Sequence, residues 1–151
     1  MRASVAGIRG QTGPMEMVRF GIHQGVIEEA AESWLYVWTL TETTGVVYVG
    51  GTGLPPHLRT WLHLHSDDPD VARIAHRYPE ALFTSFEVIA GRLPDELDRA
   101  SSKEELIRHL HAQSLLDERY VGDPPVPGGG DERVVEAVRP LVEAIEGLHR
   151  R

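Results

Sequence analysis

Two apolar runs joined by a turn constrain the fold of this chain more than any other feature of its sequence. Residues 34–40 read WLYVWTL and residues 46–49 read VVYV. Both runs are dense in the aromatic and β-branched side chains that strands favour. The segment between them, TETTG, has the small and polar residues of a turn. The sequence therefore predicts an antiparallel β-hairpin over residues 34–49.

The residues after this hairpin predict a helix that starts at a pair of prolines. Glycines at 50, 51 and 53 precede the segment Leu-Pro-Pro at 54–56. Proline suits the first turn of a helix because its missing N–H would have no partner there. We expect this helix to extend to about residue 65. Arg59 and His63, four residues apart, then project from one face of it. Because a helix that directly follows a hairpin packs beside its strands, we expect Tyr36, Tyr48, Arg59 and His63 to converge on one exposed cleft.

The next segments predict the rest of a small α/β domain of the α+β type. The sequence DDPD at 67–70 is expected to form a turn and to cap a second short helix. Residues 83–90 have the composition of a third strand. The sequence SSKEE at 101–105 predicts the start of a third helix, which extends to about residue 116. We therefore expect a three-stranded, mainly antiparallel sheet flanked by helices over residues 33–120.

The segments before this domain differ from it in composition. Residues 1–19 contain glycine, threonine and proline without an apolar period, which predicts a disordered tail. Apolar residues within 20–32 recur with helical spacing, so we expect a short helix leading into the domain.

The C-terminal part of the chain predicts a linker followed by an amphipathic helix. Residues 121–130 contain the run PPVPGGG, which favours an irregular linker. In residues 131–151 an apolar stripe recurs at helical spacing, interrupted by Pro140, where a kink is expected. The stripe consists of Val134, Val138, Leu141, Ile145 and Leu148. Two alternatives follow: the helix packs on the domain, or it pairs with a copy of itself through residues 134–148.

Composition limits the chemistry that this chain can carry out. Its 151 residues suit one domain with appended segments. The absence of cysteine excludes thiol catalysis, disulfide bridges and thiolate zinc sites. The formal net charge of -8 argues against a generally positive nucleic-acid surface but allows a local basic patch. No run approaches the roughly 20 apolar residues of a membrane span, so we expect a soluble, cytoplasmic protein.

The hairpin and the following helix carry a set of residues at characteristic spacing. They are Trp34-Leu35-Tyr36 in the first strand, Tyr48-Val49-Gly50 in the second, and Thr52, Leu54, Leu58, Arg59 and His63 after it. Over residues 33–120 this arrangement resembles a small, single-domain member of the GIY-YIG nuclease family, with Trp34 where the family has glycine. The resemblance implies a GIY-YIG-like fold and metal-dependent hydrolysis of DNA phosphodiester bonds.

The resemblance also implies a role for each matching side chain. Tyr36 or Tyr48 would orient the attacking water, Arg59 would neutralise the developing charge, and His63 would move a proton. The residues expected to contact the substrate are Gly50, Gly51, Thr52 and Lys103. DNA is the partner that this resemblance implies.

The metal ligand is the least regular part of the match. The family binds its divalent ion, here Mg²⁺ or Mn²⁺, through one glutamate that is followed by an apolar pair. Aligning that pair with Leu106 and Ile107 puts Lys103 at the metal position, whereas a shift by one residue restores Glu104. Glu104 is therefore the expected ligand, and Lys103 in its place would contact a phosphate directly.

Each of these residues also has a purely structural interpretation. The two tyrosines could simply fill a half-buried sheet, and Arg59 could lie in solvent. Ser101 and Ser102 each stand three residues before a glutamate, so a capping box explains Glu104 or Glu105 without any metal. Three functional hypotheses remain: a metal-dependent endonuclease, a protein of the same fold that binds nucleic acid or protein without cleavage, and a self-associating module.

Overall fold

The computed structural model describes residues 14–17, 19–27 and 32–150 and divides the chain into two units, Met1–Ala30 and Ala31–Arg151. In the first unit, β1 (Ile22–His23) and β2 (Val26–Ile27) pair as a short antiparallel hairpin. The prediction of a helix over residues 20–32 is wrong for residues 22–27, which form this hairpin. Gln24 and Gly25 both have positive φ, the conformation of a tight hairpin turn, which breaks any helix. Residues 28–31 and most of the predicted tail lie outside the described residues.

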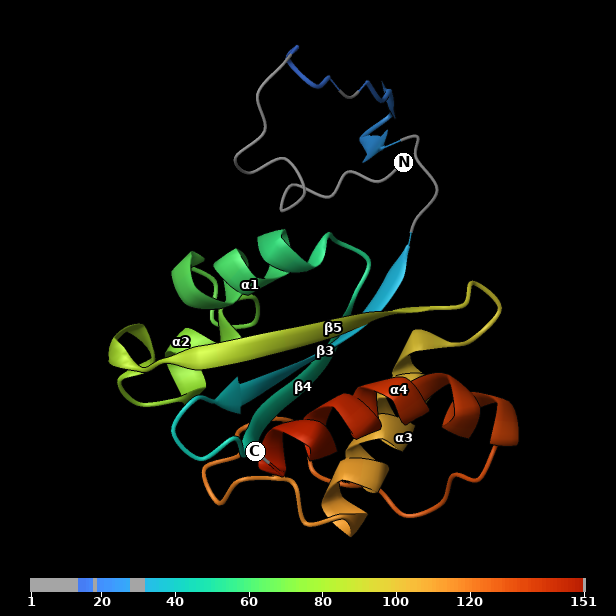
Figure 1. Cartoon of the computed structure of the whole chain (residues 1–151). Coiled ribbons are helices and arrows are strands. Elements are labelled where there is room, and N and C mark those ends of the chain that lie inside the picture. The colour runs from blue at the N-terminus through green and yellow to red at the C-terminus, as the bar shows by residue number, and fades with distance from the viewer. Residues whose placement is uncertain (1–13, 18, 28–31, 151) are drawn as a thin grey trace. The chain divides into compact units, whose positions relative to one another are not determined.

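The second unit is built on a three-stranded antiparallel sheet, as predicted (Figure 1). Its strands are β3 (Ser33–Leu40), β4 (Val46–Thr52) and β5 (Phe86–Leu93), with β3 in the centre. β5 begins three residues later than the sequence indicated, because Ala81–Phe83 form a single 3-10 turn, η2. From there β5 pairs with β3 along its whole length, from Leu40 opposite Phe86 to Ser33 opposite Leu93.

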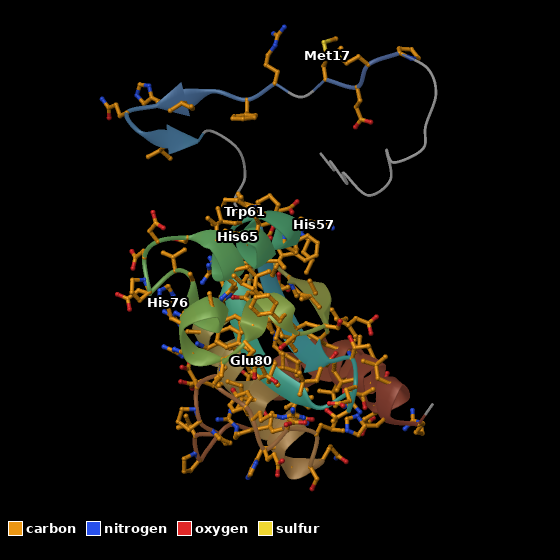
Figure 2. All side chains as sticks on the ribbon, turned by 90° about the vertical axis from the view of Figure 1, so that its left-hand side faces the viewer. Met17, His57, Trp61, His65, His76 and Glu80 are labelled. Atoms are coloured by element: carbon orange, nitrogen blue, oxygen red, sulfur yellow. The ribbon has the colours of Figure 1, made fainter. Side chains whose placement is uncertain are left out.

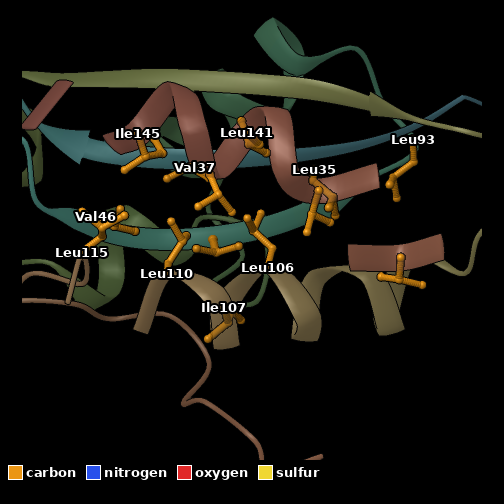
Figure 3. Close-up of a cluster of buried hydrophobic side chains, with 14 of the residues drawn as sticks. Leu35, Val37, Val46, Leu93, Leu106, Ile107, Leu110, Leu115, Leu141 and Ile145 are labelled. Carbon is orange, nitrogen blue, oxygen red and sulfur yellow. The ribbon is translucent and has the colours of Figure 1, made fainter. Parts of the chain in front are cut away.

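The alternation of side chains along β3 divides the core into two clusters, one on each face of the sheet. Leu35 and Val37 join the cluster that α3 and α4 cover (Figure 3). Tyr36 and Trp38 point to the opposite face and join residues of α2 and the following turn, including Ile74. The sheet is therefore covered on both faces, which explains why six consecutive residues of β3, from 35 to 40, are buried.

Two short helices follow β4. α1 (Pro56–His65) has Pro56 in its first turn, as predicted, and ends where the sequence indicated. α2 (Arg73–Arg77) begins later than expected and has no side-chain cap at Ala72. The aspartates form the predicted turn but not the cap, because Asp68 Oδ1 accepts a hydrogen bond of 2.9 Å from the backbone N–H of Asp70.

α3 (Arg99–Ala112) begins two residues before the predicted start. Asp98 caps it, since its Oδ2 accepts hydrogen bonds of 2.8 Å from both the backbone N–H and the hydroxyl of Ser101. The alternative in which Ser101 or Ser102 forms a capping box is therefore wrong, because both serines lie inside α3. The chain then runs along the free edge of β4, where Val46 N–H donates to the carbonyl of Leu115 at 3.0 Å.

α4 (Glu132–His149) follows the linker and packs on α3 and on the sheet (Figure 1). Val138, Leu141 and Ile145 are buried in the first core cluster, so docking on the domain is the alternative that the structure shows. Pro140 lies inside this helix. Among the described residues, no helix is both long enough and apolar enough to cross a membrane.

Candidate functional site

The structure brings three of the predicted site residues into direct contact on one face of the sheet. The hydroxyl of Tyr36 and Nε2 of His63 form a hydrogen bond of 2.7 Å. The rings of Tyr36 and Tyr48 stack with centroids 6.1 Å apart, and the Tyr48 and His63 rings lie 4.9 Å apart. The sequence-based expectation that β3, β4 and α1 converge here is confirmed for these residues.

The register of the hairpin explains why glycine follows Tyr48-Val49. Tyr36 lies opposite Gly50, and Trp38 lies opposite Tyr48. A Cβ atom at position 50 would overlap the ring and the hydroxyl of Tyr36. Gly50 therefore provides the space in which the Tyr36 side chain reaches His63.

The three side chains are buried, and in this respect the prediction of an exposed cleft is wrong. Tyr36, Tyr48 and His63 are 2%, 3% and 0% exposed, because α1 and α2 cover this face of the sheet. Burial raises the pKa of Tyr36, and the neighbouring Tyr48 raises it further. Burial, followed by the positive charges of nearby arginines, lowers the pKa of His63 to about 3. Both groups are consequently neutral near pH 7.

Three arginines surround this buried cluster, and we call them the arginine group: Arg59, Arg73 and Arg77. Their charges all act on His63. Nη1 of Arg59 donates to the carbonyl of Val71 at 2.9 Å. Nη1 of Arg73 lies 3.4 Å from the hydroxyl of Tyr48, and this hydrogen bond raises the pKa of Arg73. Nη1 of Arg77 donates to the carbonyl of Val121 at 3.3 Å.

Arg73 and Arg77 were not predicted as site residues. They are four positions apart and therefore project from one face of α2, which is the signal that the sequence contained. The signal was weak, because α2 is only five residues long and its start was misplaced. Their proximity to Tyr48 depends on the packing of α2 against the sheet, which no local pattern specifies.

Lys103 forms an ion pair with Asp123, on which the charges of Arg73 and Arg77 also act. Its Nζ lies 2.6 Å from Oδ2 of Asp123. The hydrogen bond from Lys103 lowers the pKa of Asp123, and the positive charges of Lys103, Arg73 and Arg77 contribute in the same direction. The hydroxyl of Tyr120 donates to the backbone carbonyl of Asp123 at 2.6 Å. Asp123 is thus a single carboxylate held among several cations.

The other predicted substrate-binding residues do not join this cluster. A Cβ at Gly51 would meet the side chains of Arg99 and Leu35, so this glycine faces the α3 side of the sheet. Thr52 is buried, and its hydroxyl already accepts the backbone N–H of Leu54 at 2.9 Å.

The two glutamates of α3 differ in environment. Glu104 is exposed and makes no hydrogen bond or ion pair with any described residue. Glu105 is buried; although burial alone would raise its pKa, hydrogen bonds from Arg108 at 2.7 Å and from the backbone N–H of Gly130 at 3.2 Å lower it. Glu105 therefore anchors the linker to α3 and caps nothing.

The described residues contain no cluster of metal-ligating side chains. Within residues 14–17, 19–27 and 32–150, no three His, Asp or Glu side chains lie close enough together to hold an ion. Glu104 makes no ion pair within this part of the chain. The Lys103 ammonium group is paired with the carboxylate of Asp123.

Aromatic side chains are distributed between the core and the surface. Trp38 is buried. Trp61 is 56% exposed, and its ring centroid lies 4.9 Å from that of His65 on the same helix, α1 (Figure 2). These two rings form an accessible aromatic pair.

No protein-family model, curated protein or solved structure matches this chain. The α+β fold is established by the strands and helices themselves, and the chemistry of the site has to be inferred from its own residues.

Proposed function

We propose that this domain binds nucleic acid through the phosphate backbone and does not cleave it. The observation that carries the proposal is the arginine group: its three positive charges all act on His63, and Arg73 lies 3.4 Å from the Tyr48 hydroxyl, in a chain whose net charge is -8. Guanidinium groups bind phosphate oxygens through paired, charge-assisted hydrogen bonds. The resemblance to GIY-YIG nucleases supports DNA as the ligand.

The chemistry of the buried cluster favours binding over hydrolysis. A general base or acid works best when its pKa lies near the working pH. Burial moves the pKa of Tyr36 above its usual value and that of His63 to about 3, and the two groups are hydrogen-bonded to each other. In the alignment that places Lys103 at the metal position, its ammonium group would repel a divalent ion.

The binding test uses fluorescence anisotropy with a labelled DNA oligonucleotide in the presence of chelator. We expect binding that weakens steeply with salt, since each phosphate contact releases a counterion. Arg77→Gln should weaken binding about fivefold to tenfold and make the salt dependence shallower by about one contact. Arg139→Gln is the matched control, because Arg139 lies exposed on α4 and pairs with Glu136 at 2.7 Å. Equal affinities for the two variants would contradict the proposal.

The cleavage test separates this proposal from the nuclease hypothesis. Supercoiled plasmid incubated with the protein and Mg²⁺ or Mn²⁺ should stay intact. Metal-dependent nicking that disappears in Glu104→Gln would show that Glu104 is a metal ligand and that the domain is an endonuclease. Nicking that survives in Glu104→Gln would point to a contaminating nuclease and leave the binding result to decide.

A further inference from the structure

Asp123 lies at a position where three positive charges stabilise an anion. Its Oδ2 accepts a hydrogen bond of 2.6 Å from Lys103. Arg77 reaches the same segment by donating to the carbonyl of Val121 at 3.3 Å, and the charges of Arg73 and Arg77 both act on the Asp123 carboxylate. Carboxylate and phosphate oxygens accept the same charge-assisted hydrogen bonds from lysine and arginine. A phosphate group at this position would replace Asp123 as the acceptor of the Lys103 hydrogen bond, within the positive field of Arg73 and Arg77.

We propose that Lys103, Arg73 and Arg77 form a phosphate-binding site that Asp123 occupies in the free protein and vacates when a nucleic-acid phosphate binds. This inference rests on the proposed function and deepens it. It makes Asp123 an internal competitor for the ligand, and it gives Lys103 a binding role that begins only when its ion pair with Asp123 breaks.

The segment that carries Asp123 is built so that the carboxylate can move without unfolding the domain. Val121 N–H donates to the carbonyl of Val47 at 2.8 Å, which anchors the chain to the edge of β4 just before Asp123. After Asp123 the sequence PPVPGGG has no helix or strand. The Asp123 side chain is 47% exposed, and its ion pair within the described residues is with Lys103. The backbone carbonyl of Asp123 accepts the hydrogen bond from Tyr120.

The first experiment measures binding of a labelled DNA oligonucleotide to Asp123→Asn, which keeps the size of the side chain and removes its charge. We expect binding about tenfold tighter than that of the unmodified protein at low salt, with a salt dependence steeper by about one contact because Lys103 is released. Glu136→Gln is the matched control, since it removes the same charge from an ion pair of 2.7 Å on α4. Its affinity should change less than about threefold by long-range charge alone.

A second variant separates displacement of Asp123 from the general effect of charge. Tyr120→Phe removes the hydrogen bond to the Asp123 carbonyl and leaves every charge in place. It should tighten binding severalfold, whereas Tyr78→Phe, at a buried tyrosine, should not. Lys103→Ala combined with Asp123→Asn should abolish the gain. Thermal melting of each variant establishes that it folds. If Asp123→Asn fails to fold, Tyr120→Phe still tests the proposal.

The outcomes distinguish this inference from the function on which it rests. If the unmodified protein binds DNA and Asp123→Asn binds no more tightly than Glu136→Gln, the internal competitor is refuted and the proposed function stands. If neither the unmodified protein nor Asp123→Asn binds DNA at low salt, the proposed function fails. Inorganic phosphate that raises the melting temperature of Asp123→Asn, without any DNA binding, would support the anion site and overturn the nucleic-acid ligand.

Discussion

At the residue scale, the side chain of Tyr36 fills the space that a side chain at position 50 would need. The Tyr36 ring cannot move away easily, because its hydroxyl is hydrogen-bonded to His63 at 2.7 Å and the whole group is buried. Overpacking at such a position forces neighbours out of their preferred conformations. The glycine of Tyr-Val-Gly is thus required by the packing of the cluster, whatever ligand the domain binds.

Gly50→Ala should therefore destabilise the domain by about 1–3 kcal/mol. Gly147→Ala is the matched control, because a Cβ there meets no atom within 4 Å and the position lies inside α4. That change should stabilise the domain by roughly 0.5–1 kcal/mol, since alanine favours a helix over glycine. Urea unfolding of both variants makes the comparison, and equal stability of Gly50→Ala and the unmodified protein would contradict the packing argument.

At the element scale, α4 has the apolar stripe that its sequence indicated, and this stripe forms a large part of the first core cluster. Ile145 is fully buried at 0% exposure, while Glu143 on the same helix is exposed. Truncating a buried isoleucine leaves a cavity and should lower the free energy of unfolding by about 2–5 kcal/mol in Ile145→Ala. Glu143→Ala should change it by less than about 0.5 kcal/mol. Denaturant unfolding that finds equal losses would show that α4 does not contribute to the core.

The elements also show where sequence-based prediction succeeds and where it stops. The β3–β4 hairpin, α1 and α4 were predicted because their signals are local: dense runs of β-forming residues, a proline in the first helical turn and an apolar stripe. The 22–27 hairpin was missed because its weak helical period concealed a turn with positive φ at Gln24 and Gly25. α3 starts earlier than predicted because Asp98 caps it, and β5 starts later than predicted because a 3-10 turn precedes it.

The candidate site was predicted only in the part that adjacent elements bring together. Tyr36, Tyr48 and His63 come from two paired strands and the helix that follows, so their contact could be inferred. The contact between Lys103 and Asp123 joins α3 to the irregular segment that follows it, 20 positions further along the chain. No periodicity predicts such contacts, because they depend on how the chain returns along the edge of β4 after α3.

At the scale of the whole molecule, charge is distributed unevenly. The chain carries a net charge of -8, yet the positive charges of Lys103, Arg73 and Arg77 all act on the single carboxylate of Asp123. A negative molecule with a local cationic site repels nucleic acid at long range and attracts it at short range. Moderate salt therefore screens both effects, so affinities have to be compared at matched ionic strength.

The buried histidine makes the stability of the whole domain depend on pH. The pKa of His63 falls from its usual 6.5 to about 3 in the folded protein, so below pH 6.5 the unfolded chain binds a proton that the folded chain does not. The contribution of His63 to the free energy of unfolding should be fully present above its unfolded pKa of 6.5 and should be lost progressively as the pH falls towards 3. Between about pH 7 and pH 5 the loss should be about 2 kcal/mol, from 1.4 kcal/mol per unit.

This pH window isolates His63 from the carboxylates. The pKa values of Glu105, Asp117 and Asp123 are all lowered by their hydrogen bonds and ion pairs, so their contributions are lost only at more acidic pH. His63→Gln retains a hydrogen-bonding side chain beside Tyr36 but does not titrate, and its unfolding free energy should stay nearly constant from about pH 7 to pH 5. His111→Gln, at an exposed position of α3, should lose stability as the unmodified protein does. If His63→Gln shows the same loss, protonation of the buried imidazole is not what destabilises the domain in mild acid.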